Sequence, residues 1–142
     1  MATWKYDETS IDWEKLSNLY KIAPLGHKNA DDLQKVFGNS MYKCFVFEDG
    51  DLVGVGRALA DGVDCSYICD VAVHPRCQGT GLGKSIVQKL VSLSASHKKI
   101  ILYSAPGKES FYKKLGFKRM STAMAIFSDQ AHALKVGLLN EK

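Results

Sequence analysis

The fold of this chain is decided by the stretch Gln78-Gly79-Thr80-Gly81-Leu82-Gly83-Lys84. It follows the apolar run from Tyr67 to Val73 and precedes a helical pattern from Ser85 to Leu93. Glycines at a strand-to-helix turn let backbone N–H groups approach an anion closely, and the helix N-terminus adds a positive dipole. Residues 78–84 are therefore predicted to form a phosphate cradle.

Two common phosphate-binding patterns do not fit this stretch. The P-loop pattern requires a glycine five positions before Gly83, where this chain has Gln78. The dinucleotide pattern Gly-x-Gly-x-x-Gly also fails, because the glycines fall at 79, 81 and 83. The phosphate group that this cradle binds is therefore expected to belong to another kind of ligand.

A third pattern does fit, with Gln78, Gly81 and Gly83 as Gln-x-x-Gly-x-Gly. It resembles the acyl-CoA diphosphate signature of the GCN5-related N-acetyltransferase (GNAT) superfamily, in which Arg is commoner than Gln at the first position. A second segment, Phe111-Tyr112-Lys113-Lys114-Leu115-Gly116-Phe117, resembles the Phe-Tyr-x-Lys-Leu-Gly-Phe segment of the same family. The resemblance covers residues 42–127.

Periodicity and turn residues predict an α+β chain. Helices are expected over 11–22 and 29–37, followed by strands over 42–48, 52–60 and 65–73, a helix over 85–96, a strand over 99–103, a helix over 107–115, and strands over 117–120 and 123–127. The resemblance implies a GNAT-like acyl-CoA N-acyltransferase fold, with a mixed, mostly antiparallel sheet flanked by helices. Residues 1–142 are expected to form a single N-acetyltransferase domain.

Composition narrows the class of protein. The 142 residues are 46% hydrophobic and 24% charged, and the net charge is +4. No apolar run approaches the roughly 20 residues of a membrane helix, and no secretory signal is seen at the N-terminus. The basic residues are scattered apart from one cluster at 113–119, so no nucleic-acid partner is expected. The expectation is a cytoplasmic protein without a membrane or nucleic-acid partner.

Cysteine spacing does not predict a metal site. The four cysteines, Cys44, Cys65, Cys69 and Cys77, contain no Cys-x-x-Cys pair. We expect reduced thiols, no bound metal and no covalent enzyme intermediate.

The resemblance implies acetyl-CoA as cosubstrate. Its amide-rich arm would pair with the backbone of Val71 and Val73 at an open strand edge, as an added strand does. The full set of expected cosubstrate-binding residues is Val71, Ala72, Val73, Gln78, Gly79, Thr80, Gly81, Leu82, Gly83 and Lys84.

Two catalytic residues are expected. The resemblance assigns Tyr112 as the general acid for the leaving thiolate, whereas its spacing alone also fits a core tyrosine. Asp70 is a candidate base, with Tyr67, as a holder of water, and His27 as alternatives. Strand alternation places the Asp70 side chain on the face of the strand opposite to that of Tyr67 and Cys69. A β-bulge at this point would turn the Asp70 side chain to the other face.

The expected reaction is direct attack by the primary amine of a small molecule on acetyl-CoA. A protein lysine or N-terminus is the alternative acceptor, and a non-catalytic CoA-binding module is the alternative class. Arg57 is expected to line the acceptor cleft or to pair with a carboxylate. An apolar face predicted over 128–139 fits either a docked terminus or a homodimer contact.

Overall fold

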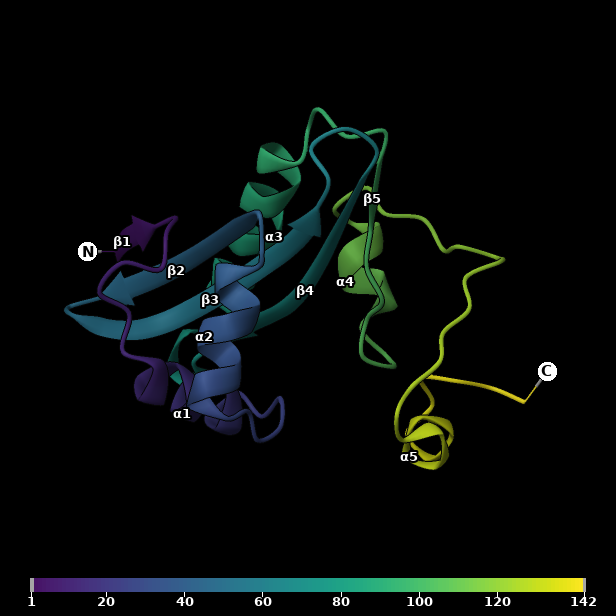
Figure 1. Ribbon diagram of the computed structural model, residues 1–142, viewed down its shortest axis with the longest axis horizontal. Coiled ribbons are helices and arrows are strands. Elements are labelled where there is room, and N and C mark those ends of the chain that lie inside the picture. The colour runs from purple at the N-terminus through teal and green to yellow at the C-terminus, as the bar shows by residue number, and fades with distance from the viewer. Residues whose placement is uncertain (1, 142) are drawn as a thin grey trace. The chain divides into compact units, whose positions relative to one another are not determined.

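The computed structural model describes residues 2–141 and divides into two compact units (Figure 1). The first ends at Leu102 and the second begins at Tyr103. Each unit is described by itself. In the described residues, no helix combines the length and the apolar character needed to cross a membrane.

The first unit is built on a five-stranded sheet with the strands in chain order. The first four strands run antiparallel and the fifth is parallel to the fourth. The mixed, mostly antiparallel sheet predicted from the sequence is therefore confirmed. The strands are β1 (Ala2–Lys5), β2 (Tyr42–Glu48), β3 (Asp51–Ala60), β4 (Cys65–Val73) and β5 (Lys99–Ile101).

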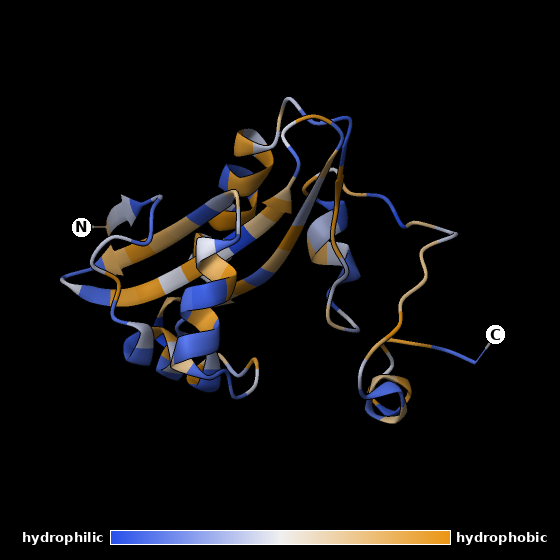
Figure 2. Ribbon diagram, viewed as in Figure 1, coloured by the Kyte–Doolittle hydropathy of each residue, from blue (hydrophilic) through white to orange (hydrophobic). Residues whose placement is uncertain are grey.

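Two amphipathic helices cover one face of this sheet. The helices α1 (Trp13–Ile22) and α2 (Ala30–Gly38) are capped by Asp12 and Asn29, whose side chains accept hydrogen bonds from N–H groups of the first turn. Figure 2 shows mainly hydrophobic colour along β2 and both colours on α2. Their apolar sides form the core with the sheet, and its fully buried members include Leu16, Leu19, Tyr20, Leu33, Phe37, Phe45 and Val55.

A third helix, α3 (Leu82–Leu93), packs against the opposite face, where β3 carries glycine. A Cβ atom at Gly54 would lie 2.8 Å from Cδ1 of Ile86, and one at Gly56 would lie 2.8 Å from Cδ1 of Leu90. These distances are shorter than side-chain contacts allow, so the two glycines permit α3 to approach the strand closely. Because the cradle ends at the start of α3, this packing also positions the cradle.

The second unit contains two short helices, α4 (Glu109–Lys113) and α5 (Gln130–Lys135). The strands predicted over 117–120 and 123–127 are wrong: residues 117–127 are all described and none of them is in a strand. Met124 is 96% exposed and Ile126 is 94% exposed. With neither a partner strand nor buried side chains, an extended segment gains nothing from its β propensity.

Substituting Gly56→Val tests the close packing of α3. The valine side chain enters space filled by Leu90 and Ile86, so the free energy of unfolding should fall by about 1–3 kcal/mol. Urea denaturation measures this change. Leu59→Val, at an exposed position near the end of the same strand, is the matched control and should alter stability by less than about 0.5 kcal/mol. Equal effects of the two substitutions would contradict this account.

Candidate active site

The predicted phosphate cradle has the backbone that anion binding requires. It follows the short 3-10 helix η1 (Pro75–Cys77) and includes two left-handed residues, Gly79 at φ +80° and Gly81 at φ +90°. Neither position is crowded, so glycine is favoured there by backbone conformation.

The start of α3 is open to a ligand. Gly81 occupies the N-cap position without a side-chain cap, and Ser85 N–H donates the first helical hydrogen bond to Gly81 O at 3.0 Å. The N–H groups of residues 82–84 precede that bond, so they have no acceptor in the helical ladder. This arrangement suits a phosphate oxygen, and the exposed Lys84 adds positive charge in the same turn.

Gln78 has a structural contact that its motif did not predict. Its Nε2 donates to Val73 O at 3.1 Å and to Ala23 O at 3.4 Å. The side chain therefore joins the cradle to the end of β4 and to the residue that follows α1.

The last residues of β4 present an open edge. The pairing between β4 and β5 covers only Cys65 to Tyr67. On the other side, His74 N–H donates to Val53 O of β3 at 2.7 Å. Because backbone groups alternate along a strand, the N–H group of Val73 points away from β3. Val73 O also points away from β3, because it accepts the hydrogen bond from Gln78 Nε2.

A β-bulge in β4 turns Asp70 onto the face covered by α1 and α2. Cys69 pairs with Arg57 and Ala72 pairs with Val55. Between these two pairs the chain advances three residues along β4 but only two along β3. Asp70 adopts φ +57°, a left-handed conformation that Asp tolerates better than most residues. The bulge, rather than simple alternation, therefore determines where this carboxylate points.

Asp70 is the centre of a polar cluster. Arg57 Nε lies 2.8 Å from Asp70 Oδ2, and Lys28 Nζ lies 3.5 Å from Oδ1. Tyr20 Oη donates to Asp70 O at 2.6 Å, and burial raises the pKa of that phenol. Arg57 also donates to Ser40 Oγ at 3.2 Å. The pairing of Arg57 with a carboxylate, one of its two predicted roles, is confirmed.

Thiol chemistry is disfavoured at this site. Burial raises the pKa of Cys69 to about 11 and that of Cys44 to about 12. At neutral pH both groups remain thiols, which are poor nucleophiles. All four cysteines are free, and residues 2–141 contain no group of three or more potential metal ligands.

Tyr112 lies on α4, in the second unit. Its ring makes edge-on contacts with Phe111 and Phe117, at centroid distances of 5.0 Å and 6.1 Å. Burial raises the pKa of the phenol, which therefore keeps its proton at neutral pH. Tyr112 is chemically suited to donate a proton, and its role as general acid stays a prediction.

Of the alternative bases, His27 is exposed in the loop between α1 and α2, and Tyr67 is half-buried in β4. Sequence reasoning missed Lys28 and Ser40. Neither belongs to a motif, and each reaches the cluster from a connection next to α2.

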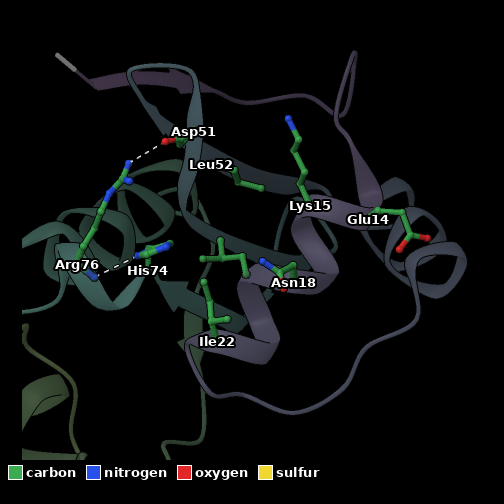
Figure 3. Close-up of a pocket in the computed structure, with 9 residues that line it drawn as sticks. Glu14, Lys15, Asn18, Ile22, Asp51, Leu52, His74 and Arg76 are labelled. Carbon is green, nitrogen blue, oxygen red and sulfur yellow. Dashed lines mark hydrogen bonds and ion pairs between the residues drawn. The ribbon is translucent and has the colours of Figure 1, made fainter.

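A surface pocket of about 330 Å³ lies between α1, the start of β3 and the residues that follow β4 (Figure 3). Arg76 and Asp51 form an ion pair at 3.3 Å on one side of it. Its lining carries both signs of charge and includes none of the predicted cosubstrate-binding residues. An extended ligand bound along a strand edge does not require such an enclosed pocket.

Comparison with known proteins identifies the class. Residues 19–125 match the family model of the acetyltransferase (GNAT) domain, and the chain belongs to this family. A probable acetyltransferase from meticillin-resistant Staphylococcus aureus has a similar fold, with a TM-score of 0.79 and 21% identity over 89% of this chain and 98% of that one.

Two curated plant proteins are more similar in sequence. A chloroplastic serotonin N-acetyltransferase from Oryza sativa subsp. japonica is 40% identical over 48% of this chain and 35% of its own length. A histone acetyltransferase from Glycine max is 37% identical over 50% of this chain and 29% of its own length. The matched part of this chain thus spans about a third of these relatives.

Replacing Asp70 by Asn tests the polar cluster. The amide keeps the shape and tolerates φ +57°, but it leaves Arg57, whose side chain is only 13% exposed, without its counter-charge. The free energy of unfolding should fall by about 1–3 kcal/mol. Asp64→Asn breaks the solvent-screened, exposed ion pair with Lys99 and should cost much less stability than Asp70→Asn. Urea denaturation compares the two, and equal losses would count against a structural role for Asp70.

Proposed function

We propose that this protein transfers the acetyl group of acetyl-CoA to the primary amine of a small molecule by direct attack. The observation that carries the proposal is the continuity of residues 71–84. An open strand edge, able to pair with amides, is followed by η1 and then by a helix N-terminus without a side-chain cap. Acyl-CoA has this combination of groups, an amide-rich arm joined to a diphosphate.

The proposed binding mode uses the backbone throughout. The amides of the arm form hydrogen bonds with the backbone of Val71 and Val73, and the diphosphate oxygens accept hydrogen bonds from the N–H groups of residues 82–84. Lys84 adds charge to the diphosphate. Gly79 and Gly81 keep the cradle open, because larger residues do not readily adopt their φ angles.

The proposed reaction forms one C–N bond and breaks one C–S bond. Asp70, directly or through water, accepts a proton from the substrate ammonium, and the neutral nitrogen then attacks the thioester carbonyl carbon. Collapse of the tetrahedral intermediate expels the CoA thiolate, which receives the proton of Tyr112. The nitrogen loses its remaining excess proton as the amide forms, and that proton, passed through water, restores the phenol of Tyr112. The high pKa values of Cys69 and Cys44 support attack without an acyl-enzyme intermediate.

Two classes of acceptor carry the primary amine that this reaction requires. The names of the two plant relatives include one small amine and one protein target. We favour a small amine, with a protein lysine or N-terminus as the second candidate. Thiol release from acetyl-CoA against spermidine, tryptamine, amino sugars, amino acids and lysine peptides separates these classes. If acetyl-CoA binds but none of these amines causes thiol release, the protein is a non-catalytic CoA-binding module.

Tyr112→Phe tests the general acid. Removing the phenolic proton should lower kcat about 100-fold, the lower end of the range for general acid catalysis. Acetyl-CoA affinity, measured by calorimetry, should stay the same because the ring and its contacts with Phe111 and Phe117 remain. Tyr103→Phe, on an exposed tyrosine of the same unit, is the control. Unchanged turnover in Tyr112→Phe would exclude Tyr112 as the acid.

Cys69→Ala tests direct attack. Since Cys69 is protonated at neutral pH, its removal should leave kcat essentially unchanged in the thiol-release assay. Mass spectrometry of the wild-type protein after incubation with acetyl-CoA alone should show no acetyl thioester on cysteine. An acetylated Cys69, or a large loss of turnover in the variant, would replace direct attack with a two-step mechanism.

A further inference from the structure

The strongest additional signal is the position of the Lys28 ammonium group. Its Nζ lies 3.5 Å from Asp70 Oδ1 and 5.4 Å from the centroid of the Tyr20 ring. A carboxylate and an aromatic face together form an environment that favours an alkylammonium ion. A primary amine of the chain itself therefore occupies a site suited to primary amines.

The two oxygens of Asp70 are engaged differently. Oδ2 receives a short bond from Arg57 Nε, at 2.8 Å. The 3.5 Å between Lys28 Nζ and Oδ1 exceeds the roughly 2.7–2.9 Å of a charge-assisted hydrogen bond. Arg57 thus fixes the carboxylate, while Oδ1 retains the capacity to accept a full hydrogen bond from another ammonium.

Lys28 can leave this position without a movement of its loop. Ser17 Oγ donates to Lys28 O at 2.5 Å and attaches the backbone to α1. The Lys28 side chain is 31% exposed and that of Asp70 is 22% exposed, so solvent reaches the pair. The flexible methylene chain allows the ammonium to swing into water while the backbone stays in place.

We propose that Asp70 Oδ1 and the Tyr20 ring form the acceptor-ammonium subsite and that Lys28 is its resident competitor. This inference rests on the proposed acetyl transfer and specifies its acceptor: a primary ammonium on an unbranched methylene chain, the group that Lys28 itself presents. The exchange replaces one positive charge by another, so the charge around Asp70 is unchanged. Asp70 immediately precedes Val71, where the acyl-CoA arm is proposed to pair.

A resident competitor affects substrate affinity and leaves the chemical step unchanged. In Lys28→Gln, the acceptor no longer has to displace an ammonium, so KM for n-butylamine should fall about two- to fivefold, with kcat unchanged. Lys21→Gln removes the same charge from an exposed position on α1 and should leave KM unchanged. Identical kinetics in the two variants, or a fall in kcat confined to Lys28→Gln, would overturn the proposal.

A binding experiment without acetyl-CoA separates this inference from the proposed function. Lysines are labelled by reductive ¹³C-methylation, which retains their charge, and the Lys28 signal is identified by its loss in Lys28→Gln. Addition of n-butylamine should shift the Lys28 signal toward that of a solvated lysine, and Asp70→Asn should abolish the response. An unresponsive Lys28 signal would refute the subsite even in an active enzyme. A responsive signal without turnover would support the subsite and refute the acetyl transfer.

Discussion

The site depends on the two contacts that hold the bulge of β4. Tyr20, a buried residue of α1, donates to the backbone oxygen of Asp70, and Arg57 on β3 pairs with its carboxylate. Regular alternation would direct that carboxylate toward the face where Ile86 and Leu90 pack, and an unpaired charge is costly there. The bulge places the carboxylate on the face covered by α1 and α2, where the Arg57 and Lys28 side chains pair with it. Helix packing and site geometry are therefore set by the same residues.

Local signals in the sequence predicted most of the first unit. The bounds of β2 and β4 were correct because apolar and β-branched runs end there at turn residues. In the cradle, Gly79 and Gly81 adopt the left-handed backbone that favours glycine. The short strand β1 was missed, because its four residues are exposed or half-buried and show no hydrophobic alternation. The strands expected after residue 116 were wrong, because β propensity requires a partner that no local pattern specifies.

The site was predictable only where a motif marks it. Gln78 to Lys84 is contiguous, so spacing identified the cradle. The cluster around Asp70 combines residues from α1, two connections and two strands, separated by as many as 50 positions in the chain. Arg57 was noticed because a charged residue among glycines on a strand is unusual, whereas Lys28 and Ser40 lie in segments whose composition is typical of surface loops. The direction of Asp70 followed from the bulge, which alternation cannot foresee.

The missing cap at the start of α3 has a thermodynamic consequence. Most helices satisfy their first N–H groups with a side chain, as α1 and α2 do here. The N-cap of α3 is Gly81, which offers no side-chain acceptor and costs the helix a few tenths of a kcal/mol relative to a capping side chain. An anion bound at that position supplies the missing acceptors only in the folded state. Folding and anion binding would then be linked equilibria, and the free energy of unfolding would rise with the concentration of the bound anion.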